Sequence, residues 1–428
     1  MMRAQLPYPA LFLAAALAAA PQARAQEPAE PPKPQPPVLT AGKDGFSLKS
    51  ADGAFVLRLR GYVHADGRFW LGDDERPATD TFLLRRLRPI FEGTLYEFVD
   101  FRIMPDFGEG QTRLFDGYIE ARFTPAAKVR VGKFKPPVGL ERLQSATDIV
   151  FVERALPSNL VPNRDVGVQL AGDLAAGRLA YAVGVFNGVQ DGASGDTDTD
   201  DSKDVAARLF ATPFAKGEGP LEGLGFGLAA SRGNQRGTAA APALPSYRTQ
   251  GQQTFFGYRT DGVASGGPTL ADGARERLSP QAYLYRGPLG PMAEHVRSSQ
   301  EVRRGTTQAE LTHDAWQLAA SWVLTGEDAS YRGVTPRVPF DRETGAWGAV
   351  ELIARFSALD VDDDAFPFFA DPAAAASEAT AWGVGVNWYL GRGVRLGANY
   401  ETTSFEGGAP TGDREDERVL LTRLQINF

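Results

Sequence analysis

The chain lacks several residue types on which whole classes of proteins depend. It has no cysteine among its 428 residues, which excludes disulfides, thiolate metal sites and a cysteine nucleophile. Its three histidines, His64, His295 and His313, stand in no recognisable nucleophile or metal motif. No phosphate-cradling glycine loop is present, and the net charge of −8 argues against a nucleic-acid partner. We therefore expect no enzyme activity, no catalytic residue, no metal site, no cofactor and no nucleic-acid partner.

Long apolar runs are also scarce, which excludes a helical membrane protein. The run at residues 10–20 follows Arg3 and precedes the triplet Ala23-Arg24-Ala25. It is well short of the roughly 20 residues that a membrane-spanning helix needs, so it favours a signal peptide over the alternative of a transmembrane anchor. We predict a signal peptide at residues 1–25, cleaved on export. Residues 26–44 contain "EPAEPPKPQPP" and are expected to form an extended proline-rich tether.

From residue 45 to residue 428 the dominant feature is a two-residue period, in short segments separated by Gly, Pro, Asp and Asn. In one segment Phe115, Ile119 and Phe123 alternate with Asp116 and other polar residues, and the end of the chain alternates in the same way. Segments of about ten residues with one apolar and one charged face match the wall of an outer-membrane barrel. The predicted fold is all-β, a transmembrane antiparallel β-barrel of sixteen strands in a bacterial outer membrane.

Soluble β-folds also alternate, but a sandwich of this length would divide into domains and a propeller would show a repeat of about 40 residues. The strand count is open, because the pattern yields seventeen segments whereas single-chain bacterial barrels have an even number. Either residues 254–260 add a strand, or residues 308–324 hold one strand instead of two. The direction of the strands between residues 325 and 380 is open as well.

Two cations break the alternation. Arg85 shares its parity with Leu87, and Lys133 shares its parity with Val131. A lipid-facing Arg or Lys costs about 2 to 4 kcal/mol near the bilayer midplane. Each cation therefore needs a position at the rim or a β-bulge, which shifts the alternation by one residue.

One connection between strands has an unusual composition. Residues 136–164 are basic, apolar and interrupted by proline, although connections in compact domains are mostly short and polar. Outside a barrel, Val138, Leu140 and Phe151 would be exposed to water. We predict that this loop folds into the lumen and narrows the pore. A loop that packs outside against a neighbouring subunit is the alternative.

Basic residues are concentrated around this loop. Residues 53–165 contain 17 Lys and Arg against 16 Asp and Glu, whereas residues 166–428 contain 23 against 33. Several of the cations are two residues apart, which places both on one face of a strand. Acidic residues such as Asp116 and Glu120 can instead neutralise these charges. The predicted pore-lining and anion-binding residues are Arg58, Arg60, Arg86, Arg88, Lys128, Arg130, Lys133, Lys135, Arg142, Arg154 and Arg164.

Four segments carry a family resemblance: "VGKFKPPVGLERLQSATDIVFVERALPSNLVPNRDVGVQLAGDL", "AYAVGVFNG", "GAWGAVELIARFSALDV" and "VGVNWYLGRGVRLGANYE". Together they resemble the hallmark region and later strands of the phosphate-selective porin O and P family. The resemblance implies a sixteen-stranded homotrimeric porin whose basic lumen attracts small anions, phosphate or polyphosphate above all. Its other partners would be outer-membrane lipid and lipopolysaccharide. A plugged, non-conducting structural or adhesive barrel is the alternative function.

Overall fold

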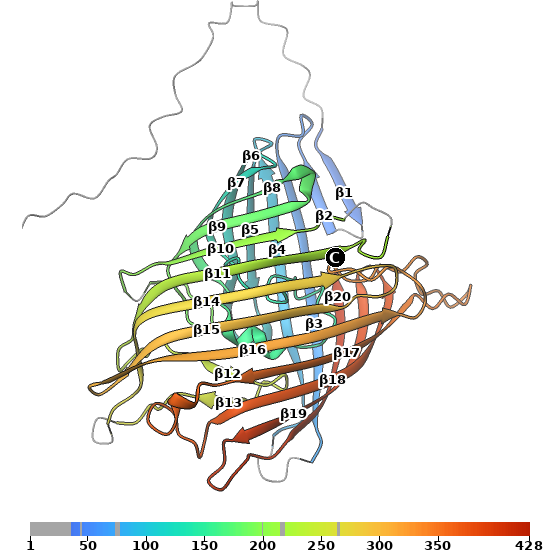
Figure 1. Ribbon diagram of the computed structural model, residues 1–428. Helices are drawn as coiled ribbons and strands as arrows, with labels where there is room; N and C mark the ends of the chain where they lie inside the picture. Colours follow the sequence, from blue (N-terminus) through green and yellow to red (C-terminus); the bar gives the residue numbers. More distant parts are fainter. Residues whose placement is uncertain (1–35, 43–44, 73–77, 199, 215–218, 263–265) are drawn as a thin grey trace, which may run out of the picture. The chain divides into compact units, whose positions relative to one another are not determined.

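The computed structural model describes residues 36–428, apart from 43–44, 73–77, 199, 215–218 and 263–265. Within these residues sixteen antiparallel strands form one closed barrel (Figure 1), which confirms the predicted fold. The barrel strands are β3 (Val56–Trp70), β4 (Thr81–Leu95), β5 (Val99–Asp106), β6 (Arg113–Thr124), β7 (Ala127–Phe134), β8 (Asp165–Leu174), β9 (Leu179–Phe186), β10 (Asp204–Ala211), β11 (Leu224–Arg236), β14 (Leu270–Leu284), β15 (Met292–Arg304), β16 (Thr307–Val323), β17 (Ala349–Asp360), β18 (Ala376–Gly391), β19 (Val394–Gly407) and β20 (Glu417–Asn427).

Among the residues that the structure describes, helical structure is confined to short turns. The 3₁₀ turns are η1 (Gly108–Gly110), η2 (Leu156–Leu160), η3 (Ala175–Gly177) and η5 (Asp363–Ala365). In the described part of the chain, no helix is long and apolar enough to cross a membrane.

The barrel closes where the last strand meets the first. β20 pairs with β3 from Val419↔Trp70 to Asn427↔Tyr62, and Gly61 and Phe428 exchange two backbone hydrogen bonds of 3.0 Å. We call the end that carries this C-terminus the turn end. The opposite end, which carries residues 135–164 and 237–262, is the long-loop end.

The N-terminal part adds a hairpin at the turn end. β1 (Val38–Gly42) pairs with β2 (Gly45–Lys49), and β2 pairs with the first residues of β3. The predicted signal peptide at residues 1–25 lies outside the described residues, and so does most of the predicted tether.

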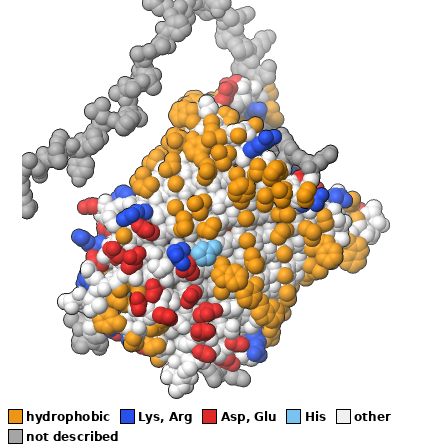
Figure 2. Space-filling view, viewed as in Figure 1, with side chains coloured by type: hydrophobic (Ala, Val, Ile, Leu, Met, Phe, Trp, Pro, Cys, Tyr) orange, Lys and Arg blue, Asp and Glu red, His pale blue; other side chains and the backbone are white. Residues whose placement is uncertain are grey.

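The walls of the barrel sort their side chains by face, as a period of two requires. On β16, Trp316, Leu318 and Trp322 are exposed on the outside, whereas Gln317 and Ser321 are buried on the inside. Figure 2 shows the resulting hydrophobic surface of the outer wall, with acidic side chains gathered beside it at the lower left. An apolar exterior of this kind matches the hydrocarbon core of a bilayer.

Two β-bulges change which residues face inward. Between β3 and β4 the register shifts so that His64 pairs with Arg86 and Ala65 with Leu84, which leaves Arg85 as the extra residue. Of the two positions that the sequence allowed for Arg85, a rim position or a bulge, the structure has the bulge. A second shift pairs Met104 with Asp116 and Pro105 with Leu114, so Phe115 is the extra residue on β6. The prediction that Phe115 belongs to the outward apolar face is therefore wrong.

The remaining ambiguities of the sequence are resolved by three segments. The region around residues 308–324 forms the single strand β16, which explains the overcount. Residues 254–257 form β13 (Thr254–Gly257), which pairs with β12 (Ser246–Arg248) in a separate hairpin within the connection 237–269. β17 pairs antiparallel with both β16 and β18.

Candidate permeation pathway

The long loop at residues 135–164 crosses the lumen from β7 and β8 to the opposite wall. Its apolar Leu140, Ile149 and Phe151 are buried. Side chains of the far wall hold its backbone. Glu294 Oε2 accepts from the amide of Leu140 at 2.6 Å, Asn399 Oδ1 accepts from that of Val152 at 2.6 Å, and Arg395 donates to the carbonyl of Ile149 at 2.8 Å. The prediction of a lumen-folded constriction loop is confirmed.

A second connection enters the lumen from the same end. The β12–β13 hairpin buries Tyr247, Phe255 and Phe256 completely. It is joined to η2 of the constriction loop by two reciprocal hydrogen bonds: Asn159 Nδ2 donates to the carbonyl of Arg248 at 2.9 Å, and Asn159 Oδ1 accepts from its amide at 3.0 Å. The sequence did not predict that this hairpin enters the lumen, because a short aromatic strand has the same pattern in a barrel wall and in an inserted hairpin.

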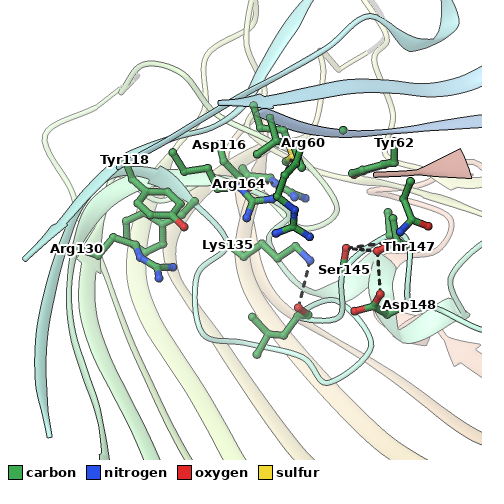
Figure 3. Close-up of a pocket in the computed structure, with 18 of the residues that line it drawn as sticks. Arg60, Tyr62, Asp116, Tyr118, Arg130, Lys135, Ser145, Thr147, Asp148 and Arg164 are labelled. Atoms are coloured by element: carbon green, nitrogen blue, oxygen red, sulfur yellow. Dashed lines mark hydrogen bonds and ion pairs between the residues drawn. The ribbon is translucent and has the colours of Figure 1, made fainter. Parts of the chain in front are cut away.

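Two cavities lie on either side of the constriction loop. The one on the turn side has a volume of about 510 Å³ and is lined by six Lys and Arg against two Asp. The one on the long-loop side has a volume of about 400 Å³ and is lined by nine Lys and Arg against three Asp and Glu. Lys135 and Arg164 line both cavities, and Figure 3 shows their side chains converging with Arg60 on the same space. Lys and Arg therefore outnumber Asp and Glu in the lining of both cavities, although the whole chain carries −8.

Many of the lining cations have an acidic partner. The predicted residues in this group, each within ion-pair distance of a carboxylate, are Arg60 (Glu92, 3.0 Å), Arg86 (Glu153, 3.2 Å), Arg88 (Asp106, 2.8 Å), Arg130 (Glu120, 2.7 Å) and Arg164 (Asp116, 3.1 Å). Aromatic rings support several of them. Arg88 and Arg164 lie 3.8 Å and 4.8 Å from the centroid of the Phe115 ring. The bulge that turns Phe115 inward thus provides an electron-rich face beneath two lumen cations.

The three basic residues at the centre of the loop have no acidic partner among the described residues. Lys135 Nζ donates to the carbonyl of Gln144 at 2.5 Å. Arg154 donates to the carbonyls of Glu141 at 3.1 Å and Gln144 at 2.8 Å. Arg142 donates to the carbonyl of Ser158 and to Asn163 Oδ1. Carbonyl oxygens satisfy these donors without carrying a net charge, so none of the three charges is neutralised by a carboxylate in direct contact.

The electrostatics of the loop reflect this crowding of cations. Burial, together with Arg164 and Arg154, lowers the pKa of the Lys135 ammonium well below its usual range, and Asp116 only partly opposes this. Burial alone would raise the pKa of Glu153, but Arg85 and Arg86 hold it well below its usual range. The carboxylate of Glu153 therefore stays ionised in the loop and neutralises part of the basic wall.

Three predicted residues do not reach either cavity. Arg58 is exposed near the turn end of β3. Lys128 forms an ion pair of 2.9 Å with Asp173 near the turn end of β7. Lys133 pairs in register with Val166 on the outward face, where its ammonium binds Asp196 and its side chain is 5% exposed. It thus occupies the rim position that its parity required.

The cavities also contain basic residues that were not predicted. These are Arg85, Arg102, Arg113, Arg208 and Arg248. Arg208 alternates with apolar residues on β10, so period-two sorting of that strand would have found it. Arg248 lies on the inserted hairpin, whose position the sequence does not reveal.

A closed barrel of sixteen strands with an inserted loop and a charged lumen is the architecture of an outer-membrane porin. Residues 57–428 match the family described as phosphate-selective porin O and P, and the chain belongs to that family. Porin O of Pseudomonas aeruginosa is 23% identical, over 91% of this chain and 92% of its own length.

Solved barrels share the fold at lower identity. The trimer form of OmpT, an outer membrane protein of Vibrio cholerae, superposes with a TM-score of 0.53 at 11% identity, over 88% of this chain and 100% of that one. An anion-selective porin from Comamonas acidovorans superposes with a TM-score of 0.54 at 11% identity, over 87% and 100% of the two chains. The protein is therefore an outer-membrane porin.

Proposed function

We propose that the protein is a passive pore for small anions that admits phosphate or polyphosphate. The observation that carries this proposal is the set of cations without a direct ion pair at the constriction, Lys135, Arg142 and Arg154. Their field acts where the path is narrowest, and an excess of lining Lys and Arg precedes and follows them. An anion can then pass between several weak sites instead of stopping at one tight site.

The preference for phosphate over chloride rests on geometry. Guanidinium groups present paired donors that match two oxygens of a phosphate, whereas a spherical ion cannot use both at once. Arginines predominate in the proposed lining, which consists of Arg60, Arg86, Arg88, Arg130, Lys135, Arg142, Arg154 and Arg164. Phosphate would therefore dwell longer than chloride and reduce the chloride current.

The proposal also covers the export of the protein, its oligomeric state and its lipid surroundings. We infer that residues 1–25 are removed on export and that residues 26–44 form a tether ahead of the barrel domain at 45–428, with its last residues paired as β1. We also infer that the barrel assembles as a homotrimer among lipid and lipopolysaccharide. The apolar outer wall supports contact with lipid, and the trimer form of the similar Vibrio cholerae barrel supports the oligomeric state.

Planar-bilayer recording of the purified porin tests this function. We expect discrete conductance steps in chloride, and a decrease of the chloride current as phosphate is added. Lys135→Gln should raise the phosphate concentration for half-block, whereas the matched variant Lys133→Gln, two residues away on the outward face, should not. The absence of conductance steps would support the plugged structural or adhesive barrel. Steps without phosphate block would leave a general pore and contradict the phosphate proposal.

A further inference from the structure

The connection at residues 324–348, between β16 and β17, is unusual for its position. It lies at the turn end, where other connections such as 96–98 and 392–393 are short. Short turns at that end are the rule for outer-membrane barrels. The segment does not project away from the barrel. Its Ala329 and Val334 are buried against Val323 and Tyr389 of the wall.

Tyr331 of this segment contacts the constriction loop on the side that faces the turn end. Its hydroxyl donates to the carbonyl of Leu140 at 2.6 Å, and its own carbonyl accepts from Gln144 Nε2 at 2.8 Å. Its ring stacks on Tyr283 of β14, with centroids 5.3 Å apart and planes inclined by 24°. Tyr331, whose ring packs on the wall, thus holds the constriction loop at two points, once through its hydroxyl and once through its backbone carbonyl.

Gln144 links these contacts to the cations of the pore. Its carbonyl accepts hydrogen bonds from both Lys135 and Arg154, at 2.5 Å and 2.8 Å. Its side-chain amide donates to Tyr331. Gln144 is therefore bound to the turn-end segment through its side chain, and its carbonyl binds two of the three cations that lack an ion pair, Lys135 and Arg154. Leu140 is held from both sides, because its amide donates to Glu294 and its carbonyl accepts from Tyr331.

We propose that residues 324–348 form a brace that positions the anion-binding cations, with Tyr331 and Gln144 as the positioning residues. The inference deepens the proposed anion function and rests on it. A long loop in a lumen must lose conformational entropy to hold its charges in place. Contacts from the constriction loop to the far wall fix part of its backbone, and the brace fixes the part that carries Gln144.

The test compares two tyrosine variants in planar-bilayer recordings of the full porin. Tyr331→Phe removes only the hydroxyl that binds the loop. Tyr285→Phe is the matched control, because its ring lies in the same aromatic cluster and its hydroxyl makes no hydrogen bond to the described residues. We expect Tyr331→Phe to raise the phosphate concentration for half-block about fivefold, the effect of losing one hydrogen bond. Gln144→Leu should act in the same direction, and Tyr285→Phe should match the wild type.

The readout separates positioning from general stability. The folded fraction, read from heat-modifiable mobility in gels, and the chloride conductance should stay near wild-type values in Tyr331→Phe. A wild-type porin that is blocked by phosphate, with Tyr331→Phe and Gln144→Leu blocked at the same concentration, would overturn the brace and leave the anion function intact. If the wild type itself showed no phosphate block, the proposed function would fail and the brace would fail with it.

Discussion

Two groups of inward-facing cations occupy the same barrel and differ in their partners. The first group is ion-paired with buried carboxylates: Arg277 with Asp191 and Asp204, Arg355 with Glu141 and Glu401, and Arg423 with Asp66 and Glu153. The second group, at the centre of the constriction loop, has no acidic partner among the described residues: Lys135, Arg142 and Arg154. The comparison shows that pairing, more than residue type, decides what a lumen cation does.

The paired group joins the wall to the inserted loops. Arg355 binds Glu401 at 2.8 Å on one side and Glu141 of the constriction loop at 3.5 Å on the other. Its charge is neutralised within contact distance, so it adds little to the field in the pore. The unpaired group is opposed only by carboxylates beyond ion-pair distance, such as Asp116 near Lys135, so more of its charge contributes to that field. Substitutions in the first group should therefore affect stability, and substitutions in the second should affect selectivity.

The largest expected effect is on stability, from Arg355→Met. The change leaves Glu141 and Glu401 without their counter-charge in a buried site, and breaking such a pair costs about 3 to 5 kcal/mol. We expect the free energy of unfolding, measured by urea titration of the refolded barrel, to fall by that amount. The control is Arg297→Met, which breaks an exposed pair with Asp314 on the outer wall and should cost less than about 1 kcal/mol. Equal losses in the two variants would contradict the distinction.

The next effect is on selectivity, from Lys135→Glu. The change reverses two units of charge at the constriction, which shifts the energy of an anion and of a cation about 4 Å away in water by about 2 kcal/mol each, in opposite directions. The anion-to-cation permeability ratio therefore changes by about 4 kcal/mol, close to a thousandfold. The measurement is the reversal potential in a salt gradient. Lys133→Glu makes the same change on the outward face and should leave the ratio unaltered. A shift of similar size in both variants would show that the field does not depend on where the lysine lies.

A third prediction uses pH to remove the same charge. Burial and the neighbouring Arg164, Arg154 and Arg142 lower the pKa of Lys135, so the ammonium loses its proton as pH rises through this lowered value. Anion preference should therefore weaken on the alkaline side at a lower pH than the usual lysine value of about 10.4 would give. Lys135→Arg keeps its charge and should flatten the profile. A pH profile that is the same in the wild type and in Lys135→Arg would exclude Lys135 as its source.

The smallest effect concerns the aromatic support of the paired cations. Phe115→Leu removes the ring beneath Arg88 and Arg164 while keeping an apolar side chain. A cation–π contact is worth about 0.5 to 1 kcal/mol at such sites, so phosphate block should change by about two- to fivefold. Phe123→Leu, on the outward face, is the control. The dose-response of the chloride current to phosphate checks both.

The two-residue period predicted most of the wall, because a one-residue error would turn every lipid-facing side chain inward. The apolar composition of residues 136–164 predicted the inserted loop, because those side chains need cover. Bulges limit this reasoning. The sequence indicated either a bulge or a rim position at Arg85, but nothing in it indicated a bulge at Phe115, and the second bulge turns that ring into the lumen.

The face on which each cation lies, and whether it has an acidic partner, was harder to predict than the fold. Lys133 and Lys135 are two residues apart, so alternation would place them on the same face. β7 ends at Phe134, however, and the chain then turns into the lumen with Lys135 while Lys133 stays outside. Ion pairs join strands that are far apart in sequence, and no spacing rule shows which arginine meets a carboxylate. The contacts of Tyr331 with the constriction loop could not be predicted for the same reason, because they join segments that are far apart in the sequence.

The reversal potential of the wild-type porin across a potassium chloride gradient tests the central claim most directly. The chain carries a net charge of −8, so a channel governed by its overall charge would prefer cations. The unpaired cations at the constriction predict a reversal potential close to that of chloride at low salt. The preference should shrink in high salt, because the field is screened within about 10 Å at 0.1 M and within about 3 Å at 1 M. A reversal potential on the potassium side at low salt would contradict the account.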